Sequence, residues 1–328
     1  MTKFKVYVSD YDYGNIDIEK SILEPIGAEV IGLQCKTGEG LADFAKDADA
    51  IIQQYAKIPR ATIEKLTNCK IIARYGIGVD IVDVEAAYEN GMVVTNVPDY
   101  CLDEVADHSI AMSLMLIRNI PFYNAKTHEG SYQWQDWRGH IPRMRDSVYG
   151  LIGFGRIAQN LTKKIKAFGF DVIAYDPYVS ESYMATMGVK KVDLDTVFAT
   201  SNVVNVLAPY TKETHHIVNE DRLKKMRRDA YLVGVTRGKC IDNKALYKAL
   251  KEQWIVAAAI DDPEEEPMKM KNWTPDKNLL FTLDNFFCTP HVAYVSLGSL
   301  NECRHVAANN VKAVLLGQPA IDLVKSKK

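Results

Sequence analysis

Residues 150–158 read Gly150-Leu151-Ile152-Gly153-Phe154-Gly155-Arg156-Ile157-Ala158. The apolar run at 149–152 predicts a β-strand, and apolar residues at spacings of three to four over 157–168 predict a helix after it. In this strand–turn–helix order, Gly153 permits a tight turn, and Gly155 lets a pyrophosphate approach the amino terminus of the helix. Ala158 allows the helix to pack closely on the strand. We therefore predict a dinucleotide-binding turn at this point.

A carboxylate at the end of the next expected strand specifies the dinucleotide. The strand is predicted at 171–175, and Asp176 follows it, 23 residues beyond Gly153, near the spacing of about 20 that is typical of this motif. A carboxylate there accepts hydrogen bonds from both hydroxyls of the adenosine ribose, and it repels the additional phosphate of NADP. We therefore predict NAD as the cofactor.

Short apolar runs alternate with helix-length segments along the whole chain of 328 residues. One series of expected strands covers 5–8, 29–33, 50–53, 70–73 and 92–95, and a second covers 149–152, 172–175, 203–207, 231–235 and 256–260. This alternation is typical of parallel sheets with crossover helices. At about 100–200 residues per domain, we predict an α/β protein with two doubly wound parallel-sheet domains.

A helical pattern at 103–118 separates the two series, and Asp103 is expected to cap its start. The polar and aromatic stretch at 119–145 indicates a covering segment rather than part of a sheet. The last strand is expected to end near Cys288, and a helical pattern at 297–316 occupies most of the remaining chain. Such a final helix can return to the first domain, which would make that domain discontinuous.

The composition limits the class of protein. Apolar residues make up 47% and charged residues 25%, as in average globular proteins, so long disordered or coiled-coil regions are not expected. Forty basic and forty-two acidic side chains give a net charge of −2, without the basic footprint of a nucleic-acid-binding protein. No apolar run reaches the length of about 18 residues needed for a membrane span. The six cysteines lack C-x-x-C spacing, so we expect no metal site and a reduced, cytoplasmic setting.

A second glycine-rich stretch, at 74–80, also follows an expected strand. Ile81 stands where a small residue would be needed for close helix packing, which argues against a second dinucleotide site. Asp99, at the matching spacing, follows Pro98 and lies beyond its strand rather than at the tip. Two interpretations remain open: a tight structural turn, or a loop whose amides hold a small anion such as a substrate carboxylate.

The chain resembles the D-isomer-specific 2-hydroxyacid dehydrogenases over nearly its whole length. The resemblance rests on segments in the family's order at 76–80, 96–108, 150–158, 232–242 and 261–267, and on Thr289-Pro290-His291. It implies a Rossmann NAD-binding domain that is inserted into a discontinuous, flavodoxin-like substrate domain. The expected boundaries are 1–100 with 292–328 for the substrate domain, and 101–291 for the NAD-binding domain.

The resemblance also implies the catalytic residues. The family's arginine in an Arg-Gly dipeptide corresponds to Arg237, its glutamate before a proline to Glu266, and its histidine after Thr-Pro to His291. The chemistry agrees, because a histidine can give and take a proton near neutral pH. A neighbouring carboxylate stabilises the imidazolium, and an arginine fork binds the substrate carboxylate and polarises the ketone.

The resemblance assigns the binding residues as well. On the substrate side these are Gly76, Ile77, Gly78 and Tyr100, with the N–H groups of Ile77 and Gly78 on the carboxylate. Asp261 is expected to bind the carboxamide of nicotinamide. The expected cofactor-binding residues are Gly153, Gly155, Arg156, Ile157, Asp176, Ala208, Pro209, Thr214, Val235, Thr236 and Asp261. The relatives are usually dimers, which implies a homodimer here.

The chain departs from the family in places that affect the substrate pocket. Gly234 stands where asparagine is frequent, Thr236 where a smaller residue is usual, and Asp262 where an apolar residue is usual. The segment 268–274 makes the run between Glu266 and the Thr-Pro-His motif longer than in many relatives. Loops near a cleft set selectivity, so the particular 2-oxo acid is not specified.

We therefore expect an NAD-dependent (R)-2-hydroxyacid dehydrogenase that acts on a small-molecule 2-oxo acid, with neither a nucleic acid nor a membrane as partner. An NAD-sensing binding protein, as in the family's corepressor branch, is the alternative from another class, because that branch can keep the catalytic set. A phosphite-type dehydrogenase is the alternative within the family. Formate is disfavoured, since formate dehydrogenases typically carry glutamine at the position of Glu266.

Overall fold

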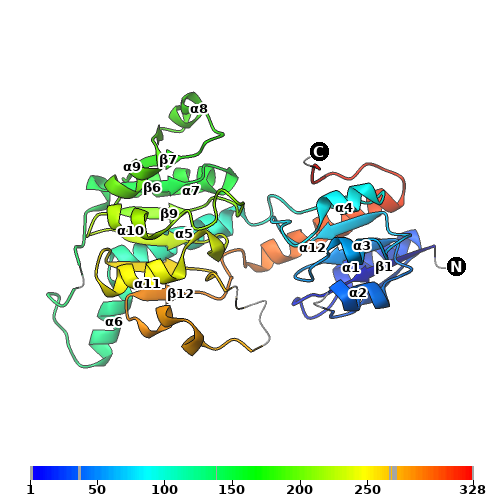
Figure 1. Ribbon diagram of the computed structural model, residues 1–328, viewed down its shortest axis with the longest axis horizontal. Helices are drawn as coiled ribbons and strands as arrows, with labels where there is room; N and C mark the ends of the chain where they lie inside the picture. Colours follow the sequence, from blue (N-terminus) through cyan, green and yellow to red (C-terminus); the bar gives the residue numbers. More distant parts are fainter. Residues whose placement is uncertain (1–2, 36–37, 138, 266, 268–271, 327–328) are drawn as a thin grey trace. The chain divides into compact units, whose positions relative to one another are not determined.

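The structure is a computed structural model that describes residues 3–35, 38–137, 139–265, 267 and 272–326. The chain divides into two compact units (Figure 1). The first unit contains Met1–Tyr100 and Val295–Lys328, and the second contains Cys101–Tyr294. One unit is thus made from both ends of the chain and the other from its middle.

The first unit is built on a five-stranded sheet in the order β2-β1-β3-β4-β5, in which all pairs are parallel. The strands are β1 (Phe4–Val8), β2 (Ala28–Gly32), β3 (Ala50–Gln53), β4 (Ile71–Arg74) and β5 (Val93–Thr95). The α-helices between them are α1 (Asp17–Leu23), α2 (Gly38–Phe44), α3 (Arg60–Ile63) and α4 (Val84–Glu89). Strands β3 and β4 are buried throughout, as expected of a parallel sheet covered on both faces.

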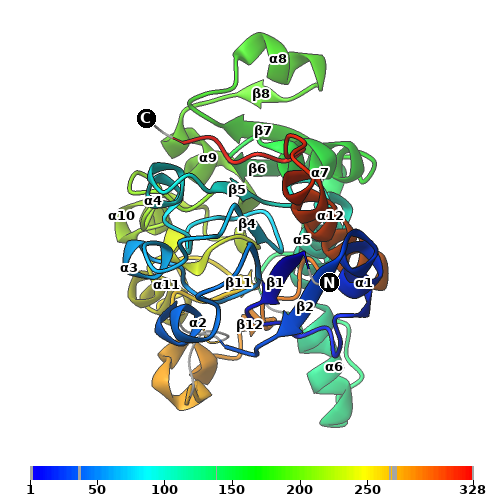
Figure 2. The same cartoon turned by 90° about the vertical axis from the view of Figure 1, so that its right-hand side faces the viewer.

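The C-terminal helix α12 (Leu297–Leu315) completes the first unit. It packs on α1, β3 and β4, and two views show it beside α1 (Figures 1 and 2). Arg304 of α12 donates from Nε and Nη2 to the two carboxylate oxygens of Glu19 in α1, at 2.8 and 2.7 Å. The Tyr75 hydroxyl donates to the same carboxylate at 2.8 Å. Burial and the charge of Glu19 raise the pKa of Tyr75 well above its usual value, so this hydroxyl remains a donor.

The second unit is built on a seven-stranded parallel sheet in the order β12-β11-β10-β9-β6-β7-β8. The strands are β6 (Val148–Ile152), β7 (Asp171–Tyr175), β8 (Lys190–Lys191), β9 (Val203–Val206), β10 (Tyr231–Gly234), β11 (Ala257–Ile260) and β12 (Phe286–Cys288). The α-helices are α5 (Leu102–Ile117), α6 (Ile120–His128), α7 (Arg156–Lys166), α8 (Glu181–Thr186), α9 (Leu194–Thr200), α10 (Glu220–Lys225) and α11 (Asn243–Lys251). Strand β6 pairs with both β7 and β9, so the sheet grows in both directions from β6. Ligands bind at such a switch point, outside the carboxyl ends of the strands.

The predicted fold class is confirmed, but one local prediction about α5 is wrong. The N-cap residue is Cys101, and Asp103 lies in the first turn of the helix instead of capping it. The Asp103 carboxylate accepts hydrogen bonds from Lys164 at 2.7 Å and Asn160 at 2.9 Å, both in α7. The hydrogen bond from Lys164 lowers the pKa of the Asp103 carboxyl. The Asp103 side chain therefore binds α7 instead of capping α5.

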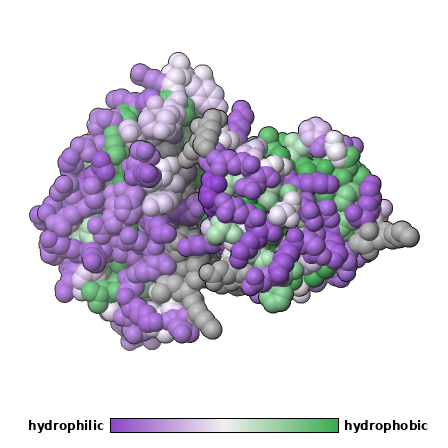
Figure 3. Space-filling view, turned by 45° about the vertical axis from the view of Figure 1, so that its right-hand side comes forward, coloured by the Kyte–Doolittle hydropathy of each residue, from purple (hydrophilic) through white to green (hydrophobic). Residues whose placement is uncertain are grey.

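The visible surface of each unit is mainly hydrophilic, with separate small hydrophobic areas (Figure 3). Within the described ranges, no helix is long and apolar enough to cross a membrane. The loop after α6 exposes large aromatic side chains: Tyr132 is 90% exposed and Trp134 is 71% exposed. Trp134 stacks on Trp137 with ring centroids 5.6 Å apart. This loop is therefore an aromatic patch on the second unit.

Candidate active site

The glycine-rich turn joins β6 to α7 and packs against the loop after β9. Gly153 has a φ of 93°, and a Cβ there would lie 2.8 Å from the backbone nitrogen of Ala208, so glycine is required. A Cβ at Gly155 would have no described atom within 4 Å. The space beside Gly155 is thus open, as a bound pyrophosphate needs. Arg156 and Ile157 form the first turn of α7, and these residues together fit a dinucleotide.

Asp176 directly follows β7 and connects that strand to the glycine-rich turn. Its Oδ2 accepts a hydrogen bond from the Phe154 N–H at 2.8 Å, and its Oδ1 accepts from the N–H groups of Tyr178 and Val179 at 2.8 and 3.1 Å. A carboxylate oxygen has two acceptor sites, so Oδ2 can accept a further hydroxyl. The position agrees with the ribose-binding role, which stays a prediction.

The predicted cofactor residues after β9 and β10 lie in neighbouring turns, because these strands pair. The Thr214 hydroxyl donates to the Pro209 carbonyl at 2.7 Å, which closes the loop after β9 on itself. The Thr236 hydroxyl donates to the Val206 carbonyl at 3.4 Å, which joins the turn after β10 to the end of β9. Val235 is buried beside it. The structure therefore brings these residues to the same sheet edge as the glycine-rich turn.

The Arg237-Gly238 turn packs directly on the turn that follows β11. A Cβ at Gly238 would overlap the carbonyl oxygen of Asp262 and the carbonyl group of Pro263. The second residue of the Arg-Gly dipeptide must therefore lack a side chain for the two turns to touch. This contact places Arg237 on the turn next to the one that follows β11.

Gly238→Ala is expected to lower stability and activity together. The methyl group fits only if the backbone of 262–263 moves, and overpacking of this kind costs about 1–3 kcal/mol. Urea unfolding should show a lower midpoint, and kcat should fall for any substrate that is turned over. Gly298→Ala is the matched control, because its Cβ would meet only the Ser296 hydroxyl, at 3.6 Å, among described atoms. Equal midpoints for the two variants would contradict the contact.

Asp261 holds the turn that carries His291. Its Oδ1 accepts from the Val292 N–H at 2.9 Å and from the Thr289 hydroxyl at 2.5 Å, and its Oδ2 accepts from the Ala293 N–H at 2.9 Å. Its backbone carbonyl accepts from the His291 N–H at 2.6 Å. Asp261 thus shapes this turn, and its predicted contact with nicotinamide stays a prediction.

His291 follows β12 with a φ of 55°, in the left-handed region that residues other than glycine rarely adopt. Its Nδ1 lies 3.3 Å from Oδ2 of Asp262. Sequence reasoning missed His108 of α5, whose Nε2 lies 3.0 Å from the Thr289 hydroxyl. No local pattern distinguishes His108 from any other helical histidine, because its partner lies 181 residues away in the sequence.

Three of the predicted substrate-binding residues of the first unit, at 76–78, lie on the loop after β4. Gly76 has a φ of 120°, which favours glycine, and the Ile77 carbonyl accepts from the Asn96 side chain at 2.7 Å. A Cβ at Gly76 would lie 3.6 Å from the Tyr100 hydroxyl, so Tyr100 flanks this loop. Both interpretations of the loop, as a structural turn and as an anion site that includes Gly78, fit this geometry.

Glu266 and residues 268–271 lie outside the described residues, so the role of Glu266 stays a prediction. The two acidic residues before it, although accessible to solvent, have side-chain partners. Glu264 places Oε1 2.6 Å from Nε2 of His216, and Glu265 accepts from two asparagine side chains at 2.8 and 3.0 Å. The chain is thus anchored just before Glu266.

Two thiols lie near this sheet edge. Burial raises the pKa of the Cys240 thiol. Burial and the charges of Asp261 and Asp262 raise the pKa of Cys288 to about 12. Both thiols are therefore neutral near pH 7 and are poor nucleophiles. In the described part of the chain, no group of three or more histidine, cysteine and acidic residues could hold a metal ion.

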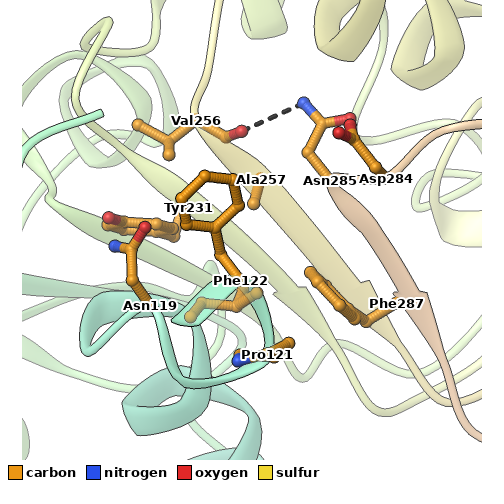
Figure 4. A pocket seen from close by; sticks show the side chains of 10 residues that line it. Asn119, Pro121, Phe122, Tyr231, Val256, Ala257, Asp284, Asn285 and Phe287 are labelled. Atoms are coloured by element: carbon orange, nitrogen blue, oxygen red, sulfur yellow. Dashed lines mark hydrogen bonds between the residues drawn. The ribbon is translucent and has the colours of Figure 1, made fainter. Parts of the chain in front are cut away.

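A small pocket of the second unit lies at the opposite edge of the sheet (Figure 4). Tyr231 and Ala257, which line it, are the first residues of β10 and β11. The Asn285 side chain, also in its wall, donates to the Val256 carbonyl at 3.0 Å. The predicted site residues follow the carboxyl ends of the strands instead, so this pocket is separate from the candidate active site.

Comparison with known proteins identifies the family. Residues 110–293 match the family model of the D-isomer specific 2-hydroxyacid dehydrogenase, NAD binding domain. The D-3-phosphoglycerate dehydrogenase of Methanocaldococcus jannaschii is 37% identical over 92% of this chain, which spans 56% of that relative's length. The glyoxylate reductase of Thermofilum pendens is 33% identical over 88% of this chain and 85% of the reductase.

A solved structure gives the same assignment. The D-lactate dehydrogenase of Aquifex aeolicus, in complex with NAD and lactic acid, superposes with a TM-score of 0.84 at 26% identity. The superposition covers 95% of this chain and 96% of that chain. The fold, the glycine-rich turn and these similarities agree. The chain belongs to the D-isomer specific 2-hydroxyacid dehydrogenase family, and the NAD-binding domain of that family occupies the middle part of this chain.

Proposed function

We propose that the protein is an NAD-dependent dehydrogenase that interconverts a small 2-oxo acid and its (R)-2-hydroxy acid. The observation that carries the proposal is the turn after β12. His291 adopts a left-handed backbone there, and Asp261 holds the turn through four hydrogen bonds. Residues that the surrounding structure holds in a rarely populated backbone conformation cluster at functional sites.

The residues divide the chemistry between them. His291 gives a proton to the carbonyl oxygen during reduction and takes it from the hydroxyl during oxidation. Arg237 binds the substrate and polarises its carbonyl group. The N–H groups of Ile77 and Gly78 bind the carboxylate, and Glu266 stabilises the protonated histidine.

NAD, when bound, supplies or accepts the hydride. The glycine-rich turn and Asp176 would hold its pyrophosphate and ribose, and the fit rests on the open space at Gly155 and the carboxylate at the tip of β7. The remaining contacts are those predicted after β9, β10 and β11. Because a carboxylate disfavours the extra phosphate of NADP, we propose a preference for NADH over NADPH.

A substrate panel tests the proposal. The purified protein is given NADH or NADPH with glyoxylate, pyruvate, hydroxypyruvate and bulkier 2-oxo acids, and loss of reduced-cofactor absorbance is followed. In the other direction NAD is supplied with 3-phosphoglycerate, because a relative carries that activity in its name, and with phosphite. We expect turnover with at least one 2-oxo acid and a higher kcat/KM with NADH.

The panel distinguishes the alternatives. Tight NADH binding without turnover of any compound would defeat the proposal and favour an NAD-sensing binding protein. Turnover of phosphite alone would replace the substrate class but keep the cofactor. Equal kcat/KM for both cofactors would contradict the role of Asp176.

The proposal also covers the oligomeric state of the protein and its location in the cell. We propose a homodimer, supported by the family resemblance and by the exposed aromatic patch at Tyr132, Trp134 and Trp137, and sedimentation analysis tests it. We also propose a cytoplasmic location, which is supported by six cysteines scattered without C-x-x-C spacing, because such a pattern does not indicate the disulfide framework of a secreted protein.

A further inference from the structure

The carboxylate of Asp262 lies beside the ring of the proposed acid and base, His291. Its Oδ2 is 3.3 Å from Nδ1 of His291, and the Asp262 side chain is only 2% exposed. Among the residues that the structure describes, this oxygen accepts no well-aligned hydrogen bond. A buried carboxylate oxygen without a donor is costly, and the imidazole N–H is a donor within reach.

The backbone fixes Asp262 in this place. Its carbonyl group and that of Pro263 pack on Gly238, where no side chain fits. The carboxylate of the preceding residue, Asp261, accepts hydrogen bonds from the Thr289 hydroxyl and from the two backbone N–H groups that follow His291. Two consecutive acidic residues thus have different tasks, because Asp261 shapes the turn while Asp262 faces the histidine ring.

We infer that Asp262 is a positioning residue for His291: its Oδ2 accepts a hydrogen bond from Nδ1–H, so that Nε2 carries the proton that is transferred. The inference rests on the proposed function. It adds a second carboxylate to the one that the family resemblance implies at Glu266, at a position where family members usually have an apolar residue.

The proton transfer balances with this arrangement. In reduction, the Nε2–H bond of the imidazolium breaks as the O–H bond of the product forms, and the electron pair stays on Nε2. The neutral ring keeps its proton on Nδ1, and this N–H donates a hydrogen bond to Oδ2 of Asp262. A carboxylate in this place selects the ring tautomer and stabilises the imidazolium, as in other carboxylate–histidine pairs.

Two variants separate positioning from mere packing. Asp262→Asn keeps the shape but loses the charge, and we expect kcat to fall about ten- to a hundred-fold, less than the loss of the acid itself. KM and NADH affinity should stay unchanged, and the solvent deuterium isotope effect on kcat should rise because proton transfer becomes slower. Asp262→Glu restores the carboxylate and should recover part of kcat.

Glu264→Gln is the matched control. It removes a carboxylate from the same loop, but that carboxylate lies 2.6 Å from a different histidine, His216. We expect this variant to leave the solvent isotope effect unchanged. In addition, ¹⁵N NMR of histidine-labelled protein reports the contact without turnover. The Nδ1–H signal of His291, assigned by its loss in His291→Asn, should move upfield in Asp262→Asn.

The outcomes are distinguishable. If the unaltered protein turns over a 2-oxo acid and Asp262→Asn matches it in kcat and isotope effect, the inference fails while the proposed function stands. A fall in kcat with a parallel fall in NADH affinity and unfolding midpoint shows a structural role and also overturns the inference. No turnover by the unaltered protein defeats the proposed function, and the inference with it.

Discussion

Replacing His291 with asparagine is expected to lower kcat for 2-oxo acid reduction by about 10²–10⁴-fold, which is the usual contribution of a positioned general acid. Asparagine is preferable to alanine because position 291 has a φ of 55°, a conformation that asparagine adopts more readily than most residues. The backbone turn is then kept while the proton donor is lost. The measurement is kcat with the best substrate of the panel, together with NADH affinity, which should not change.

His128→Asn provides the control for this prediction. His128 is an exposed histidine at the end of α6, and its Nδ1 lies 2.8 Å from the Asn124 carbonyl. This variant should keep the kcat of the unaltered protein. If His291→Asn retains kcat within about tenfold of that value, the loss is below the range expected for a general acid, and another group must transfer the proton.

Most of the strands were predictable because they are short apolar runs between helix-length segments. The predicted strand 231–235, for example, is β10 at Tyr231–Gly234, and the prediction for 50–53 is exact for β3. Strand β8 was not predicted, because Lys190–Lys191 has no apolar pattern. It forms by pairing with β7, and an edge strand of this kind is specified by its neighbour rather than by its own residues.

Single residues of the candidate site can be proposed from sequence motifs, but contacts between turns cannot. Sequence reasoning identified Arg237, His291 and the unusual Asp262 separately. Their relation depends on the register of β11 and β12, where Ile260 lies opposite Cys288. Register is set by packing across the sheet, so neither the Asp262–His291 contact nor the need for Gly238 follows from residue order.

The buried ion pair between the first and last helices is the clearest case of a contact that sequence cannot reveal. Glu19 and Arg304 are 285 residues apart, and each would ordinarily be taken for a solvated helix residue. In the structure their side chains are 0% and 6% exposed. This pair holds α12 against α1 in the first unit, because neither charge has a partner of opposite sign in the interior without the other.

Arg304→Met is therefore expected to destabilise the protein by about 3–5 kcal/mol, the usual cost of leaving one buried charge without its partner. Glu19 would keep the hydrogen bond from Tyr75 but lose both bonds from the guanidinium. The interaction of the guanidinium with the Tyr13 ring, at 5.3 Å, would also be lost. The measurement is the free energy of unfolding in urea.

Two further variants decide whether buried charge is the cause. Arg60→Met breaks an exposed pair at a similar distance, 2.8 Å from Glu89, in which the side chains are 46% and 40% exposed, so it should cost no more than about 1 kcal/mol. Glu19→Gln combined with Arg304→Met removes both buried charges, keeps an acceptor for the Tyr75 hydroxyl and should recover most of the lost stability. If the single Arg304 variant is no less stable than Arg60→Met, the pair does not hold α12 in place. If the double variant is as unstable as the single one, lost packing rather than an unpaired charge explains the effect.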